Sequence, residues 1–210
     1  YAEVPGFTPS ETVITSTMGR VIGEAKGRVI VATFASLIAR IQQVIDAATN
    51  HDRSVCVIGR SMINNVQMAI KMGYITIAPE RLVKPVDLPK IADDQITIIT
   101  TGTQGEPTSA LVRMANNDHH DISIKTGDTV VMSATPIPGN ERLVHKTIND
   151  LFRQGARVLY GKRDQVHVHG HAAREELKTM ISLINPEYFI PIHGEYRHLK
   201  IHAEIASSLG

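Results

Sequence analysis

Short apolar runs that alternate with segments of helical periodicity constrain this fold more than any other feature of the sequence. The runs lie at 29–34, 54–58, 96–100, 129–132 and 157–160. Continuous apolar runs of this length are typical of strands buried on both faces of a parallel sheet. Apolar residues recur at helical spacing in the segments beside them, at 12–25, 36–48, 62–72, 108–116 and 141–154. The sequence therefore predicts an α/β domain whose mainly parallel sheet is flanked by helices.

Small and hydroxyl-bearing residues follow four of the predicted strands. These loops lie at 33–36, 59–61, 100–103 and 133–135. In open parallel sheets ligands bind beyond the carboxyl ends of the strands, where the next helix presents free N–H groups and the positive end of its dipole. The loops together predict a cradle for an anion, although each loop taken singly is better explained by Ser and Thr as ordinary helix caps. No loop has the glycine pattern of a nucleotide P-loop or of a dinucleotide-binding turn.

Composition limits the classes of function. The chain has 210 residues, of which 42% are hydrophobic, so it can bury a substantial core. The formal net charge is only +1, so the chain as a whole lacks the strong positive charge typical of nucleic-acid-binding proteins. Any site for a polyanion must therefore be formed locally. Aromatic residues make up only 4%, which leaves few rings for stacking single-stranded bases.

Cysteine usage and the lack of long apolar runs bear on location. The single cysteine, Cys56, lies in an apolar run and is expected to be buried and inert. One cysteine excludes an internal disulfide framework, which fits a reducing cytoplasm. No run reaches the length of a membrane span and no signal-peptide pattern opens the chain, so we expect a cytoplasmic location without a membrane. The chain opens without methionine in a loop-like run, as an excised piece of a longer protein would.

Histidines gather in the last part of the chain. His167, His169 and His171 alternate in a predicted strand, which would place three imidazoles on one face. His193 follows a second predicted strand at 187–192. Such a cluster indicates a metal or phosphate site, and a structural zinc module is one alternative. Any one of these histidines is equally well explained as an ordinary solvated or core residue.

The carboxylates near these histidines are too few for a complete metal centre. Glu175 and Glu176 fall within a predicted helix and are expected to be solvated, which leaves Glu195. His198 and His202 stand four apart on the closing helix, but no glutamate follows His198, so this pair is expected at the surface. The last region thus predicts part of a metal site within a short β-α-β-α segment.

These residues, together with several loops, resemble the β-CASP region of the ribonuclease J family, in the metallo-β-lactamase superfamily of nucleases. The resemblance runs nearly from end to end, and its final segment is highly specific. The matching segments are 2–11, 32–36, 59–62, 100–107, 136–141, 170–172 and 191–200. It implies a connector from the metallo-β-lactamase domain at 1–27, a β-CASP domain at 28–160, and a returning C-terminal segment of the metallo-β-lactamase domain at 161–210.

The resemblance also implies an activity and its residues. Family members cut RNA as endonucleases and 5′-to-3′ exonucleases in RNA processing and decay, including that of ribosomal RNA, and favour 5′-monophosphorylated ends. They use two divalent ions, Zn²⁺ foremost, with Mn²⁺ or Mg²⁺ as alternatives. By this resemblance His193 is a metal ligand and His171 contacts the scissile phosphate. The substrate-binding residues it implies are Ser36, Leu37, Ile38, His167, Val168, His169, Gly170 and His171.

The sequence departs from the family at three positions. Leu37 stands where asparagine is common, and His169 and Ala173 stand where serine is common. Contacts to RNA at these positions are therefore expected from backbone N–H groups.

In the family, most metal ligands come from an H-x-H-x-D-H motif and from later His and Asp residues ahead of the β-CASP region, and this motif does not occur in the chain. We therefore expect the chain alone to be inactive, because loss of most ligands removes both the nucleophile and the charge clamp of a two-metal site. The family forms homodimers and homotetramers, which the resemblance implies for the full-length protein. A non-catalytic RNA- or mononucleotide-binding module that uses the Ser/Thr loops alone is the alternative.

Overall fold

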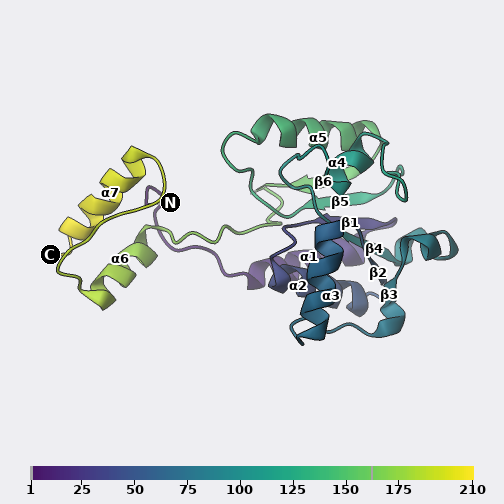
Figure 1. Ribbon diagram of the computed structural model, residues 1–210, viewed down its shortest axis with the longest axis horizontal. Coiled ribbons are helices and arrows are strands. Elements are labelled where there is room, and N and C mark those ends of the chain that lie inside the picture. The colour runs from purple at the N-terminus through teal and green to yellow at the C-terminus, as the bar shows by residue number, and fades with distance from the viewer. Residues whose placement is uncertain (1, 162) are drawn as a thin grey trace. The chain divides into compact units, whose positions relative to one another are not determined.

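A computed structural model describes residues 2–161 and 163–210 (Figure 1). The chain forms two compact units, one comprising residues 1–10 and 168–210 and the other residues 11–167. We describe the two units separately. No helix in the described part of the chain is long and apolar enough to cross a membrane.

The larger unit is built on a six-stranded sheet in the order β3-β2-β4-β1-β5-β6, in which every neighbouring pair is parallel. The strands are β1 (Val29–Ala32), β2 (Ser54–Val57), β3 (Leu82–Val83), β4 (Ile96–Thr100), β5 (Thr129–Met132) and β6 (Arg157–Tyr160). Five of them fall in the predicted apolar runs, which confirms the predicted α/β class. The short β3 lies in a proline-rich passage for which no strand was predicted.

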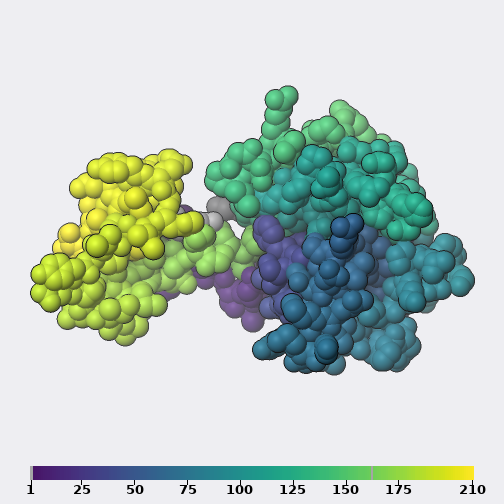
Figure 2. Space-filling view, in the orientation of Figure 1, coloured from purple at the N-terminus to yellow at the C-terminus, as the bar shows by residue number. Residues whose placement is uncertain are grey.

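Helices cover both faces of this sheet. They are α1 (Thr12–Glu24), α2 (Ile38–Asn50), α3 (Arg60–Lys71), α4 (Ala110–Ala115) and α5 (Glu141–Arg153). Three short 3₁₀ helices, η1 (Pro79–Arg81), η2 (Pro85–Lys90) and η3 (Asp93–Gln95), occupy the passage before β4. Figure 1 shows α4 and α5 on one face of the sheet and α1, α2 and α3 on the other. Figure 2 shows the purple-to-green residues of this unit packed into one continuous body.

The core of the larger unit follows from the burial of its central strands. Every residue of β1, β4 and β5 is buried, and alternate residues face opposite helix layers. Ile30 and Ile98, for example, join a cluster with Leu111 of α4 and Leu151 of α5. Cys56 is fully buried in the same cluster, and burial raises the pKa of its thiol to about 12, as expected for an inert cysteine.

The connections change side at the centre of the sheet. From β1 the chain passes through α2 toward β2, whereas from β4 it passes through α4 toward β5, and these helices lie on opposite faces (Figure 1). Strands β1 and β4 are neighbours in the sheet. Their carboxyl ends therefore form the topological switch point at which α/β sheets bind ligands.

A buried ion pair ties the amino ends of β1 and β5. Arg28 donates from Nε to Asp128 Oδ1 at 2.9 Å and from Nη2 to Asp128 Oδ2 at 2.6 Å. The pair is also hydrogen-bonded to the backbone, since Arg28 reaches the carbonyl oxygen of Ser123 and the N–H of Lys125 donates to Asp128. Both side chains are almost fully buried, so the bidentate geometry offsets a large desolvation cost.

The smaller unit contains two helices, α6 (Arg174–Ile184) and α7 (Tyr196–Ser207). Ala2, Ile181 and Ile205 form its small core, against which Phe189 packs. The amino-terminal segment is held to α6, because the N–H groups of Arg174 and Glu175 donate to the carbonyl oxygens of Val4 and Gly6.

The structure corrects the β-α-β-α prediction for 161–210. Neither 166–171 nor 187–192 forms a strand, and no strand occurs among the described residues from 163 onward. An extended segment becomes a strand only when a neighbour accepts its backbone hydrogen bonds, and the described chain supplies none here. The second segment keeps the alternation of a strand: Tyr188, Ile190 and Ile192 are each at least 80% exposed, while Phe189 packs inward.

Candidate functional site

Arg40 anchors the start of the histidine segment. Its side chain is fully buried in α2, and its guanidinium donates to the carbonyl oxygen of Val166 at 3.1 Å. Ser133 Oγ donates to the same carbonyl at 2.7 Å and accepts a hydrogen bond from Arg40. Glu11 completes the site by pairing with Arg40 at 2.5 Å. The backbone immediately before His167 is therefore fixed by side chains from two distant parts of the larger unit, one of which is held in turn by Glu11.

His171 and His193 come together in the smaller unit. Their rings stack with centroids 5.3 Å apart and planes 18° from parallel. His193 has φ 71° and Gly194 has φ 119°, so this tight turn holds the imidazole outside any regular element. Both side chains are exposed and accessible to a ligand. The structure thus brings together the predicted catalytic histidine and the predicted metal ligand.

The donor set at this pair fits part of a metal centre. Neutral imidazole is a good ligand for Zn²⁺ and Mn²⁺, but a hydrolytic site needs three or more protein ligands. Among residues 2–161 and 163–210 no group of three or more His, Cys, Asp or Glu side chains is arranged to hold a metal ion. The four histidines of the predicted cluster therefore do not form a metal site by themselves. His167 and His169 are half-buried in a segment without strand geometry.

A network around Glu176 holds the backbone that follows His171. Glu176 Oε2 accepts from Thr8 Oγ1 at 2.6 Å, from Thr8 N at 2.9 Å and from Ala173 N at 2.7 Å. These hydrogen bonds, with that of the Thr8 hydroxyl the strongest, lower the pKa of Glu176. The carbonyl oxygen of His171 lies 3.1 Å from Thr8 Oγ1 and shares the single hydroxyl proton with Glu176. Glu176 was expected to be solvated, and the structure places it instead in this hydrogen-bond network. The sequence could not show this, because the partner Thr8 lies far away along the chain.

The predicted substrate-binding residues Ser36, Leu37 and Ile38 lie in the larger unit. Helix α2 begins at Ile38 with Leu37 at its N-cap, slightly later than the predicted helical segment at 36–48. The N–H groups of Leu37 and Ile38 donate within the turn, to the carbonyl oxygens of Phe34 and Ser36. The Ser36 side chain is exposed.

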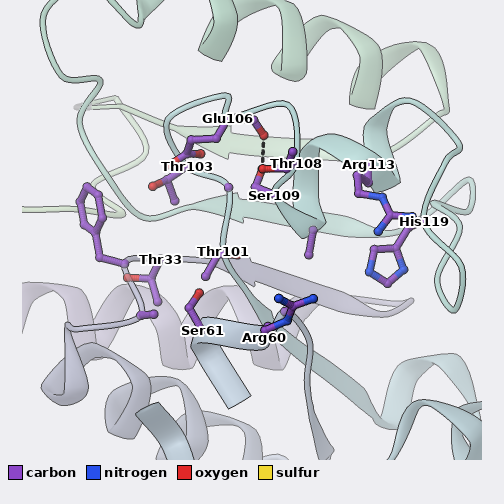
Figure 3. A pocket seen from close by; sticks show the side chains of 15 residues that line it. Thr33, Arg60, Ser61, Thr101, Thr103, Glu106, Thr108, Ser109, Arg113 and His119 are labelled. Atoms are coloured by element: carbon purple, nitrogen blue, oxygen red, sulfur yellow. Dashed lines mark hydrogen bonds between the residues drawn. The ribbon is translucent and has the colours of Figure 1, made fainter. Parts of the chain in front are cut away.

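A polar pocket lies at the switch point of the sheet, and its volume is about 730 Å³ (Figure 3). Three of the four predicted Ser/Thr loops meet there, which supports the predicted cradle. The fourth loop does not line it, because Ser133 is engaged with Arg40 and Val166. The residues that line the pocket are Thr33, Phe34, Ala35, Gly59, Arg60, Ser61, Thr101, Gly102, Thr103, Glu106, Thr108, Ser109, Ala110, Arg113 and His119.

Two glycines allow the loops to approach closely at this pocket. Gly59 has φ 100°, and a Cβ there would lie 3.1 Å from Thr101 Oγ1. Gly102 has φ 113°, and a Cβ there would lie 2.6 Å from Ser109 Oγ. Both positions need glycine for the backbone angle and for space. Nearby, Gln104 ties two loops together, because its amide donates to Thr135 O at 3.1 Å and accepts from Ile137 N at 2.8 Å.

Basic and neutral donors line the pocket along with one carboxylate. Arg60 has no carboxylate within ion-pair distance in the described parts of the chain, whereas Arg113 lies 3.7 Å from Asp118. His119 accepts from the N–H groups of Asp121 and Ile122 at Nδ1, so its Nε2 carries the proton. Burial is the main cause that lowers the pKa of His119, which keeps the ring neutral. Glu106 supplies the carboxylate. The sequence did not single out His119 as a candidate site residue.

The fold and the pocket together define an α/β domain with an anion-compatible site at the carboxyl ends of its strands. Residues 26–151 match the family described as "Ribonuclease J, beta-CASP domain", and residues 156–210 match the "Zn-dependent metallo-hydrolase RNA specificity domain". The chain belongs to the ribonuclease J family. The predicted resemblance is therefore confirmed.

Curated relatives agree with this assignment. Over 210 residues the chain is 46% identical to "Ribonuclease J" of Synechocystis sp., covering 100% of this chain and 33% of the relative. It is 46% identical over 209 residues to "Ribonuclease J2" of Bacillus subtilis, covering 100% and 38%. The identity to "Ribonuclease J" of Thermus thermophilus is 48% over 197 residues, covering 94% and 34%. The chain thus spans about a third of the length of these relatives.

Proposed function

We propose that this chain is the RNA-binding and active-site-completing part of a metal-dependent ribonuclease. The observation that carries the proposal is the stacking of His171 on His193 at 5.3 Å, in a chain of the ribonuclease J family. A phosphodiester-cleaving centre needs a metal ligand beside a group that contacts the phosphate, and the two imidazoles supply one of each. The names of its relatives support RNA as the substrate.

His193 would hold one divalent ion, with Zn²⁺ as the first candidate and Mn²⁺ or Mg²⁺ as alternatives. Two metal ions bound in such a site would activate the attacking water and neutralise negative charge on the phosphate. His171 acts on the substrate itself, donating a hydrogen bond from its ring to an oxygen of the scissile phosphate. The contact from Thr8 to His171 O and the bond from Ala173 N to Glu176 hold the backbone from which this ring projects.

The remaining predicted residues bind RNA in this proposal. Ser36 offers its exposed hydroxyl at the start of α2, and Gly170 lets the backbone approach the substrate without a side chain in the way. Leu37 and Ile38 contribute shape alone, because their N–H groups already donate within the turn. The 167–169 segment contributes shape and backbone. This set would favour a 5′-monophosphorylated end and serve both endonuclease and 5′-to-3′ exonuclease activity.

The other ligands of the metal pair would come from the rest of a longer protein. The connector at 1–27 and the segment at 161–210 would belong to its metallo-β-lactamase domain, and 28–160 to its β-CASP domain. The exposed apolar row Tyr188, Ile190 and Ile192 supports this division, because an alternating row suits a strand that packs against further protein. We further propose that the full-length protein is cytoplasmic and forms a homodimer or homotetramer.

Two measurements test the function. The isolated chain should release no product from RNA in the presence of Zn²⁺, Mn²⁺ or Mg²⁺, and robust cleavage that His193→Ala abolishes would contradict the proposed incompleteness. In the full-length protein, His171→Ala should lower kcat at least a hundredfold. The exposed His120→Ala serves as its control and should leave the rate unchanged.

The pocket of the larger unit favours one other function, a non-catalytic RNA- or nucleotide-binding module. Titration of the isolated chain with 5′-phosphorylated and 5′-hydroxyl oligonucleotides separates the two. Preference for the phosphorylated end that is lost in the His171→Ala variant supports the ribonuclease. A preference that survives this substitution favours the module, and equal binding of both ends counts against the ribonuclease.

A further inference from the structure

The residue that follows the His193–Gly194 turn, Glu195, donates its backbone N–H to a histidine side chain. Glu195 is the N-cap of α7, and the acceptor is Nδ1 of His198 in the first turn of this helix, at 3.1 Å. The N–H of His198 donates in return to the carbonyl oxygen of Glu195 at 2.9 Å. The arrangement resembles a capping box in which an imidazole replaces the usual glutamate or glutamine.

The tautomer of His198 follows from this hydrogen bond. Because Nδ1 accepts, it carries no proton, and the ring proton resides on Nε2. Nε2 lies 3.3 Å from Oε2 of Glu3, and a carboxylate at this distance favours the same tautomer. We call the Glu3 carboxylate, the His198 imidazole and the N–H of Glu195 the His198 clasp. It links the amino-terminal segment of the smaller unit to the start of α7.

The imidazole of His198 also packs against the turn. His198 was expected at the surface, yet its side chain is only 25% exposed. A Cβ on Gly194 would lie 3.2 Å from both Cβ and Nδ1 of His198, so the turn and the ring are in close contact. Glycine is needed here for space and for its φ of 119°. The ring therefore supports the turn by packing as well as by its hydrogen bond.

The supported turn has a backbone conformation that needs such support. His193 has φ 71°, which is disfavoured for a residue with a Cβ. This conformation aims its ring away from any regular element, where it stacks on His171. Residues in sparsely populated conformations persist only where the surrounding structure holds them. The His198 clasp fixes the chain two residues after His193.

We propose that Glu3 and His198 are positioning residues for His193, which orient its imidazole toward a metal ion. The inference rests on the proposed role of His193 as a metal ligand. Both residues act through the backbone of the turn, so neither needs to touch the ion or the RNA. Groups that orient a metal ligand in this way change metal affinity or activity by about ten- to a hundredfold when they are replaced.

Nuclear magnetic resonance of the metal-free chain tests the geometry at the turn. At pH 8 the imidazole nitrogen shifts should place the proton of His198 on Nε2, and nuclear Overhauser effects should connect the rings of His171 and His193. His198→Leu should speed exchange of the Glu195 amide proton about tenfold or more and abolish the contacts between the rings.

Asparagine is the conservative replacement, since its Oδ1 can accept where Nδ1 does. His198→Asn should therefore keep both the slow exchange of Glu195 and the contacts between the rings. If His198→Leu behaves like the parent chain, or if the two variants lose these signals equally, the proposal is overturned.

Two controls separate the His198 clasp from its surroundings. His202→Leu changes a histidine of the same helix that packs on an aromatic ring of the small core, and it should leave the exchange of Glu195 unchanged. Arg197→Gln removes ion pairs with Glu3 and Glu195 but keeps the imidazole, and it should change this exchange by less than about threefold. Equal effects of Arg197→Gln and His198→Leu would assign the support to the ion pairs and overturn the proposal.

The carboxylate end of the clasp has its own pair of variants. Glu3→Ala should speed exchange of the Glu195 amide proton several-fold, because the Nε2 tautomer of His198 loses its partner. Glu3→Gln keeps an acceptor for Nε2 and should have a smaller effect. If Glu3→Ala matches the parent chain, the carboxylate has no positioning role and the proposal fails.

Metal retention by the full-length protein tests the consequence for His193. His198→Leu should release Zn²⁺ at about tenfold lower chelator concentration than the parent, and His198→Asn should stay within about threefold of the parent. His193→Ala distinguishes the two ways to fail. If His193→Ala retains the metal like the parent, the proposed role of His193 is wrong. If it loses the metal while His198→Leu keeps it, only the positioning role is wrong.

Discussion

Arg40 and Val166 are joined by a hydrogen bond of 3.1 Å from the guanidinium to the backbone carbonyl, inside the larger unit. The two residues are far apart in sequence, and the carbonyl belongs to the residue just before His167. Because Arg40 is fully buried, its positive charge needs a counter-ion, which Glu11 provides. One side chain thus connects the folding of α2 to the position of a segment proposed to bind RNA.

Replacing Arg40 should therefore destabilise the larger unit strongly. We expect Arg40→Met to lower the free energy of unfolding by about 3 kcal/mol or more, since it breaks a buried charged network. Urea unfolding followed by circular dichroism measures this. Arg20→Met removes an arginine that forms an exposed pair with Glu24, and it should change stability by less than about 1 kcal/mol. Equal effects of the two substitutions would contradict the role assigned to Arg40.

The pair between Arg28 and Asp128 predicts a double-mutant result. Asp128→Ala should cost about 3–5 kcal/mol, because it leaves Arg28 buried without its counter-ion. Arg28→Met with Asp128→Leu should recover a large part of this loss, since no unpaired charge remains. Chemical unfolding of the parent chain and of these two variants tests this expectation. A double variant less stable than Asp128→Ala would show that the pair itself, rather than the unpaired charge, dominates.

Cys56 should be unreactive in the folded protein. Its pKa of about 12 leaves the thiol protonated at pH 8, and the side chain is fully buried. Alkylation by iodoacetamide, followed by mass spectrometry, should be negligible in buffer and complete in guanidinium chloride. Rapid labelling of the native chain would indicate that the core cluster around β2 opens readily.

Glu176 should make the stability of the smaller unit depend on pH. Hydrogen bonds from Thr8 and Ala173 lower the pKa of Glu176 in the folded state. The contribution of Glu176 to folding stability is therefore fully present above the unfolded pKa of about 4.3, and it is lost as the pH falls through the folded-state pKa. Glu176→Gln should therefore lower Tm at pH 6 and differ less from the parent chain at pH 3. Thermal unfolding across this range checks the sign.

Glu175 provides the control for this experiment, because its carboxylate pairs with Lys178 and not with Thr8. Glu175→Gln should change Tm little at either pH. If the difference in Tm between Glu176→Gln and the parent chain grows as the pH falls, the stabilising role assigned to ionised Glu176 is contradicted.

The sheet could be predicted from sequence because its signal is local. Ile30 and Ile98 lie in short apolar runs that are bounded by small residues, and such runs suit a strand covered on both faces. The meeting of the Ser/Thr loops followed from the same reasoning, since parallel strands end at one edge. The features that escaped prediction depend on distant partners: Arg40 with Val166, Thr8 with Glu176, and His119 with the pocket. The prediction of a strand at 187–192 was wrong for a related reason. The alternation of Tyr188 and Ile190 is a local pattern, whereas a strand also needs a neighbouring strand with which to pair.

The missing cap of α3 has a consequence for dynamics. Because no side chain closes this helix, the amide protons of Arg60, Ser61 and Met62 depend on solvent for their hydrogen bonds and should exchange quickly. Any anion that occupies the pocket would act as the missing cap. Hydrogen exchange in this single turn should then slow in proportion to occupancy, so the helix itself reports on the ligand without a label.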